Sequence, residues 1–265
     1  MDDHSADARP APAAVNVVKA AHKLGVEMVR RYHRLELSVP EQPIEDPVLF
    51  VANHGFGGVF DLNVFAAYAA FENLGLTRPV SALTHQIAWT LGAGNLLESV
   101  GSRPASRESA RDAFEAGHHV LVLPGGDIDA AKSFADRNKI VFSGRRGFAG
   151  LAMDADVPIV PVVTAGAGES LLVLDDGRRL ARALRLDSLL RVKALPVTIS
   201  VPWGLSIGTG ALLPYLGLPT KLRTTVLAPM RAQADESARE FGDRVEEAMQ
   251  AAMTAMTAGR RPIIG

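Results

Sequence analysis

A histidine and an aspartate near position 55 are the residues best suited to chemistry. His54 follows a short apolar segment, and six residues, three of them glycines, separate it from Asp61. A carboxylate bonded to one imidazole nitrogen fixes the tautomer and leaves the other nitrogen free to accept a proton. This segment predicts a general base oriented by an acid. Taken alone, it is explained better by a helix cap at Asp61 and a hydrogen-bonded loop histidine.

Other kinds of active site have little support in the sequence. The chain has no cysteine and no His-x-x-x-His or His-Glu-x-x-His pair, so we expect neither a thiol nucleophile nor a metal site. The Gly-x-Gly-x-x-Gly of dinucleotide binders and the P-loop are absent as well. The net charge of −1 argues against nucleic-acid binding.

Buried strands and helices must hold His54 in place. Apolar runs predict strands at residues 47–52, 120–123, 158–163 and 222–228, and helical patterns cover residues 62–73, 106–116, 144–154 and 235–257. This alternation predicts an α/β fold, a single domain with a largely parallel central sheet flanked by helices. Active sites in such sheets collect at the carboxyl ends of the strands, where His54 would lie.

The N-terminal part has a different character. We expect a disordered tail at residues 1–13, an amphipathic helix at residues 14–36 and one domain at residues 37–265. The helix carries lysines and arginines, so it suits an anionic membrane surface and equally well packing on its own domain. The first residues are acidic and rich in Pro and Ala, unlike a signal peptide, which predicts a cytoplasmic protein.

A long uncharged segment lies between Lys193 and Lys221. Prolines and glycines interrupt it too often for a spanning helix, which needs about 20 consecutive apolar residues. Residues 195–219 therefore predict an apolar loop or hairpin that faces lipid or an acyl chain. Core strand and turn is the alternative.

Three further blocks follow His54 in order. They are Gly101 to Ser109 with Arg107, the turn Pro124-Gly125-Gly126, and Gly144-Arg145-Arg146-Gly147 followed by Val157-Pro158-Ile159-Val160-Pro161. Together with the His54 segment, this set resembles the glycerolipid and lysophospholipid acyltransferases, particularly the branch similar to monoacylglycerol and diacylglycerol acyltransferases. The resemblance covers residues 48–163, somewhat under half the chain. The gap between His54 and Asp61 is longer than is usual in that family.

The resemblance implies transfer of a fatty acyl group from an acyl thioester to a hydroxyl of a glycerolipid, lysophospholipid or other lipid alcohol. His54 would be the general base and Asp61 its orienting acid. Backbone amides near Gly125 and Gly126 would bind the oxyanion. The Pro124-Gly125-Gly126 turn lacks an arginine common in acyltransferases that use phosphate esters, which favours a neutral or bulkier hydroxyl lipid as acceptor.

Two arginines complete the site that the resemblance implies, because Arg107 and Arg145 would bind phosphate groups. Glu169 matches a family stretch without a catalytic role. The donor would be acyl-CoA or an acyl carrier protein, with no other cofactor, and the protein would lie peripherally on the inner face of a membrane. The alternative is an inactive lipid-binding or membrane-tethering protein of the same fold.

Overall fold

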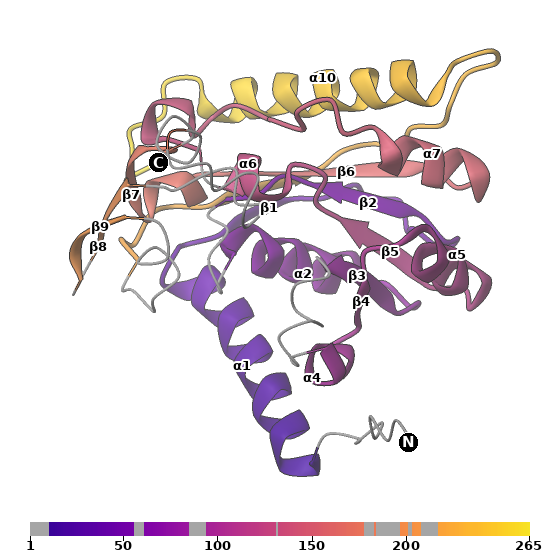
Figure 1. Ribbon diagram of the computed structural model, residues 1–265, viewed down its shortest axis with the longest axis horizontal. Coiled ribbons are helices and arrows are strands. Elements are labelled where there is room, and N and C mark those ends of the chain that lie inside the picture. The colour runs from indigo at the N-terminus through magenta and orange to yellow at the C-terminus, as the bar shows by residue number, and fades with distance from the viewer. Residues whose placement is uncertain are drawn as a thin grey trace.

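A central sheet and its helices organise the part of the chain that the computed structural model describes, namely residues 11–55, 61–84, 94–130, 132–177, 183, 197–200, 203–207 and 217–265 (Figure 1). Within these residues the sheet has seven strands. In spatial order they are β1 (Glu36–Ser38), β10 (Arg223–Val226), β6 (Ile159–Ala165), β2 (Leu49–Ala52), β5 (His119–Val122), β3 (Val80–Thr84) and β4 (Ser102–Pro104). From β6 to β4 the strands run parallel, whereas β10 and β1 run the other way. The predicted fold class is confirmed.

The sequence of strand β2 is an unbroken apolar run because the strand is buried on both faces of the sheet. All of its residues are buried, because helices cover both faces of the sheet. Leu49 and Val51 face one hydrophobic cluster, and Phe50 and Ala52 face another. Alternate residues of a strand point to opposite faces, so each face receives its own apolar set.

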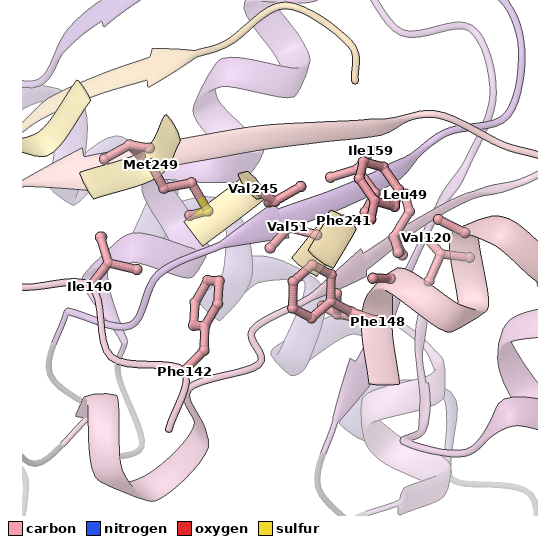
Figure 2. Packing of buried hydrophobic residues seen from close by; sticks show 14 of the residues in the cluster. Leu49, Val51, Val120, Ile140, Phe142, Phe148, Ile159, Phe241, Val245 and Met249 are labelled. Atoms are coloured by element: carbon pink, nitrogen blue, oxygen red, sulfur yellow. The ribbon is translucent and has the colours of Figure 1, made fainter. Parts of the chain in front are cut away.

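The helices divide between those two faces (Figure 1). The face of Leu49 and Val51 is covered by α5 (Arg107–Glu115), α7 (Gly147–Asp154) and α10 (Ala238–Thr257). Helix α2 (Leu62–Leu74) covers the opposite face. Figure 2 shows Phe241, Val245 and Met249 of α10 packed toward β2. The spacing of four residues places these three side chains on one face of the helix.

Helix α1 (Pro12–Arg31) packs on α2 rather than on the sheet. Its buried residues are Gly25, Val26 and Val29, and Gly25 has no room for a Cβ beside the ring of Phe65. The helix begins two residues earlier and ends five residues earlier than the predicted 14–36. It stops because Arg34 adopts a left-handed conformation, with φ of 48°, that turns the chain into β1. Residues 1–10 of the predicted tail lie outside the described residues.

A second, antiparallel sheet contains β7 (Leu172–Asp175), β8 (Val197–Ser200) and β9 (Gly204–Ile207). Strands β8 and β9 lie in the uncharged segment for which a loop or hairpin was predicted; residues 195–196, 201–202 and 208–216 of that segment are outside the described part. Ile199 pairs with Leu205, and both are exposed, at 44% and 65%. Of the helices described, none has the length and apolarity needed to cross a membrane.

Candidate active site

Hydrogen bonds between the β2 and β6 segments continue beyond the end of β2, as far as the residue before His54. Pairing between β2 and β6 ends at Ala52 and Val162. The side chain of Asn53 then replaces the next rung: its Nδ2 donates to the Thr164 carbonyl at 3.1 Å, and its Oδ1 accepts from the Thr164 amide at 2.9 Å. Nδ2 of Asn63, on α2, donates to the Asn53 carbonyl at 2.8 Å. His54 therefore starts from a backbone fixed on both sides.

Asp61 lies directly beside the imidazole of His54. Nδ1 of His54 and Oδ2 of Asp61 are 2.6 Å apart, and the two side chains are 19% and 10% exposed. The other carboxylate oxygen accepts from the amides of Asn63 at 2.9 Å and Gly55 at 3.3 Å. Asp61 is thus both the N-cap of α2 and the partner of His54, so the two readings of this aspartate are compatible.

The surroundings of His54 act on its protonation in opposite directions. Burial favours the neutral ring, but the hydrogen bond and negative charge of Asp61, helped by the charge of Asp129, outweigh burial and raise the pKa of His54 above its ordinary value. Lys132 opposes them more weakly. With Nδ1 bound to a carboxylate, Nε2 is the nitrogen that can exchange a proton with a substrate.

Asp129 is a buried contact of His54 that the sequence analysis missed. It lies on the short helix α6 (Gly126–Ala130), and its Oδ2 accepts the His54 amide at 2.8 Å. Its Oδ1 contacts Nζ of Lys132 at 2.7 Å and accepts the Val141 amide at 3.1 Å. The only available signal was an acid three residues after the Gly125-Gly126 pair.

The turn at Gly125 and Gly126 is held from both sides. A Cβ on Gly125 would clash with the side chain of Asp129, and one on Gly126, where φ is 53°, would clash with the guanidinium of Arg145. Nη1 of Arg145 donates to the Gly125 carbonyl at 2.5 Å and to the Pro124 carbonyl at 3.3 Å. The turn therefore needs glycine at both positions, and Arg145 stabilises it.

A cavity of about 410 Å³ opens beside this turn. Arg107, at the start of α5, and Arg145 both line it, and Arg107 also pairs with exposed Asp154 at 3.1 Å. The cavity is lined by Leu83, Ala105, Ser106, Arg107, Val122, Leu123, Pro124, Arg145, Gly147, Phe148 and Leu151. His54 is not in this lining. It follows β2, whose Val51 pairs with Val122 on β5. The cavity and the imidazole thus lie at the same edge of the sheet, on neighbouring strands.

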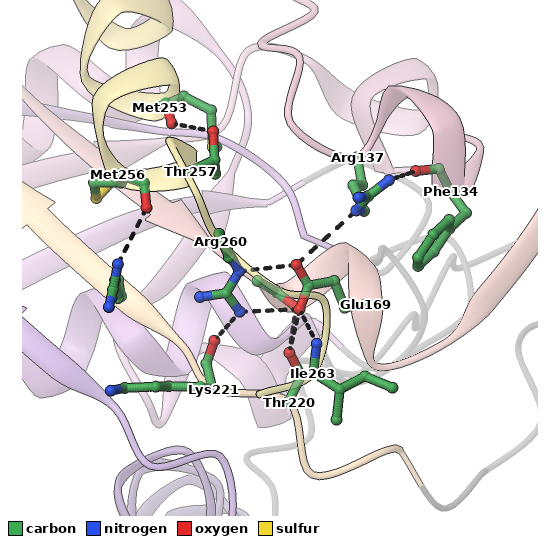
Figure 3. Close-up of polar contacts among 12 residues, drawn as sticks. Phe134, Arg137, Glu169, Thr220, Lys221, Met253, Met256, Thr257, Arg260 and Ile263 are labelled. Atoms are coloured by element: carbon green, nitrogen blue, oxygen red, sulfur yellow. Dashed lines mark hydrogen bonds and ion pairs between the residues drawn. The ribbon is translucent and has the colours of Figure 1, made fainter. Parts of the chain in front are cut away.

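A buried ionic network around Glu169 holds the turn on which Gly55 packs (Figure 3). Gly55 packs so closely on Ala167, in the 3₁₀ turn η2 (Ala167–Glu169), that a Cβ would clash. Glu169 accepts from Nε and Nη2 of Arg260, both at 2.9 Å, and from Oγ1 of Thr220 at 2.9 Å. Burial raises the pKa of Glu169, but these donors outweigh burial and lower it. The network anchors η2.

Known proteins share both the sequence pattern and the fold. The acyltransferase family model matches residues 26–165. A human protein named "DGAT1/2-independent enzyme synthesizing storage lipids" is 31% identical over 83% of this chain and 61% of its own length. An uncharacterised protein of Mycobacterium leprae is 29% identical over 88% of this chain and 63% of its own length. The chain thus spans about three fifths of these relatives.

A solved structure has the same fold. It is the 1-acyl-sn-glycerophosphate acyltransferase PlsC of Thermotoga maritima, which aligns with a TM-score of 0.53 and 15% identity. The alignment covers 93% of this chain and 82% of the other. At this identity the likeness concerns the fold alone.

Proposed function

Because the chain belongs to the acyltransferase family, we propose that it moves a fatty acyl group from an acyl thioester to a lipid hydroxyl, with His54 as general base and Asp61 as its orienting acid. The observation that supports this proposal most is the 2.6 Å contact between Nδ1 of His54 and Oδ2 of Asp61. It leaves Nε2 to receive a proton at the carboxyl edge of a parallel sheet.

In the proposed reaction, Nε2 of His54 removes the hydroxyl proton as the oxygen attacks the thioester carbonyl. The tetrahedral intermediate collapses, the carbon–sulfur bond breaks, and the imidazolium returns the proton to the leaving thiolate. Asp61 stabilises the imidazolium between these steps. A positioned general base contributes about 10²–10⁴-fold to such a rate. No covalent acyl-enzyme is needed, since the acceptor oxygen is the nucleophile.

The turn after β5 supplies the proposed oxyanion donor. The Gly126 amide already donates to the Leu123 carbonyl at 3.4 Å, so we assign the oxyanion to the Gly125 amide. From the sequence, the amides of both glycines were candidate oxyanion donors; the proposal keeps only that of Gly125. Because the side chain of Asp129 packs against Gly125, the turn is held in place before substrate arrives.

The cavity beside the turn suits the acyl donor. Its apolar wall, with Leu83, Phe148 and Leu151, can contact an acyl chain, and Arg107 and Arg145 carry positive charge. Acyl-CoA and acyl carrier protein both present the thioester on a phosphate-bearing arm, which arginine binds well. For the acceptor we propose a neutral glyceride-type alcohol, because relatives are named for the synthesis of storage lipids.

We also propose that the protein binds a membrane surface peripherally. Ile199, Leu205 and Ile207 form one exposed face of the β8–β9 hairpin. Helix α1 adds exposed Lys19 and Lys23, which precede its buried residues and suit anionic headgroups. The second half of α1 packs on α2, so only part of that helix is available for lipid.

Replacement of His54 tests the proposed function. The full chain is incubated with labelled acyl-CoA or acyl carrier protein and a panel of lipid alcohols, and the products are identified by mass spectrometry. His54→Ala should lower turnover about 10²–10⁴-fold and leave lipid association intact. His118→Ala is the control, because this imidazole contacts Ser81, away from the proposed site.

A parent chain with no turnover on any acceptor, together with retained lipid binding, would favour the inactive lipid-binding alternative instead. That alternative rested mainly on the long sequence gap between His54 and Asp61. Since the two side chains are in contact, the gap no longer favours it.

A further inference from the structure

A buried ion pair lies directly behind the proposed general base. Asp129 is fully buried, and the side chain of Lys132 is only 6% exposed. Nζ of Lys132 contacts Oδ1 of Asp129 at 2.7 Å and donates to the Lys139 carbonyl at 2.6 Å. Removing two charges from water costs several kcal/mol for each ion, so such a pair is poor evidence for stability alone. Its contacts indicate a different use.

The carboxylate of Asp129 joins three segments that the proposed reaction needs in register. Its Oδ2 accepts the main-chain amide of His54 at 2.8 Å. Its side chain packs beneath Gly125, the proposed oxyanion donor. Its Oδ1 accepts the amide of Val141, in the loop that precedes Arg145. One buried group therefore sets the distance between the base and the oxyanion turn.

We propose that Asp129 and Lys132 are positioning residues that hold the His54 main chain against the Gly125 turn and set the charge behind the imidazole. The inference rests on the proposed function, because it assigns the pair to the same proton transfer. Neither residue touches the reacting atoms. Misplacing a catalytic group by about 1 Å can cost about 10²-fold in rate, which is the scale on which such a support acts.

The charges of the pair act on His54 with opposite signs. Three charged groups among the described residues face the imidazole: Asp61 at the start of α2, Asp129 on α6 and Lys132 just after α6. A negative charge nearby stabilises the imidazolium and a positive charge destabilises it. Loss of Asp129 should therefore lower the pKa of His54, and loss of Lys132 should raise it. A group that only fills space would not produce shifts of opposite sign.

The test uses Asp129→Asn, Lys132→Met and the double variant in the full chain. The imidazole of His54 is titrated by NMR, with its resonance assigned through His54→Ala, and kcat and KM are measured across pH. We expect the His54 pKa to fall by about one unit in Asp129→Asn, to rise in Lys132→Met and to stay near the parent value in the double variant.

Asp129→Asn leaves the charge of Lys132 buried without its partner, and this variant can fail to fold. The double variant removes both charges, so it keeps the test valid in that case. Its kcat should fall about 10–100-fold, with KM for the acyl donor within about threefold, because an asparagine side chain can accept only one of the two main-chain amides that Asp129 holds and the cavity is untouched. Asp112→Asn, an exposed aspartate on α5, is the control and should match the parent.

The two proposals fail in different ways. A folded double variant with parental kcat, or an unchanged His54 pKa in both single variants of an active enzyme, overturns the positioning role. If the two single variants show opposite shifts of the His54 pKa but the parent chain transfers no acyl group, the proposed reaction is overturned. The positioning role in catalysis is then overturned with it.

Discussion

A single carboxylate, that of Asp61, serves both the helix and the imidazole. One oxygen caps α2 through the Asn63 amide, and the other contacts His54. The same contact links local folding to protonation, because the start of α2 fixes the distance at which the charge acts on the ring. Asparagine at this position can still cap the helix, so the charge can be removed with the fold preserved.

Asp61→Asn should separate the electrostatic contribution from the structural one. The proposed base works as neutral imidazole, so the rate is lost as pH falls through the raised pKa of His54. Without the Asp61 charge, burial dominates and that pKa falls, so the loss should move to lower pH. At high pH the rate should still be about 10²-fold below the parent rate, because the imidazolium is no longer stabilised.

The measurement is kcat/KM from about pH 5 to pH 9, which reports groups of the free enzyme. A midpoint that stays in place or moves to higher pH would exclude Asp61 as the charge that acts on the base.

Between elements, the structure depends on polar groups that replace hydrogen bonds of the main chain. Asn53 extends the β2–β6 pairing, and Glu169 holds η2 against the segment after α10. Gly55 sits between these supports, packed on Ala167. The position of His54 is therefore set by the sheet and η2 together.

Glu169→Gln tests the second of these supports. The change leaves Arg260 buried with a weakened partner, and breaking such a pair costs about 3–5 kcal/mol. We expect the free energy of unfolding, measured by urea denaturation at neutral pH, to fall by about 3 kcal/mol. Glu247→Gln, on the exposed face of α10, should change it little.

This contribution should also depend on pH. The pKa of Glu169 is lower in the folded protein than in the unfolded chain. The stabilisation is therefore complete above the pKa of an unfolded glutamate, about 4.3, and is lost as the pH falls from there through the lower pKa of the folded state. A difference between parent and variant that stays constant down to pH of about 3 would contradict the ion-pair explanation.

Over the whole molecule, the strong apolar periods of the sequence predicted the fold best. The segment 47–52 identified β2, and the helical pattern at residues 235–257 identified α10. Short strands such as β1 and β4 escaped prediction because three residues carry too little pattern. The reversed direction of β10 depends on pairing between distant segments, which periodicity does not encode.

The candidate site was predictable to the extent that its residues follow strands. His54 and Asp61 were found together because a strand end and a helix start bracket them. Asn53, Asn63 and Asp129 were missed, since their partners are main-chain groups on other elements that no sequence spacing reveals. Arg145 was expected to bind phosphate, and its carbonyl contacts add a structural task to that expectation.

The exposed face of β8 and β9 carries a prediction for the intact protein. Ile199→Ser, Leu205→Ser and Ile207→Ser combined should reduce the partition constant onto anionic lipid vesicles, measured by co-flotation, by about 10²-fold or more, because each removes apolar surface worth about 1–2 kcal/mol of insertion. The control combines Met153→Ser and Ile264→Ser, which are exposed elsewhere. Equal flotation of both variants would show that lipid contacts another surface.

The cavity and the imidazole lie at the same edge of the sheet but on its two opposite faces. The cavity lies under α5 and α7, whereas the His54–Asp61 pair lies at the start of α2 on the opposite side of the sheet. Thioester and alcohol can therefore enter from separate directions and reside together before any bond changes. Double-reciprocal plots of initial rates at several fixed alcohol concentrations should then intersect, whereas parallel lines would require the donor's thiol to leave first.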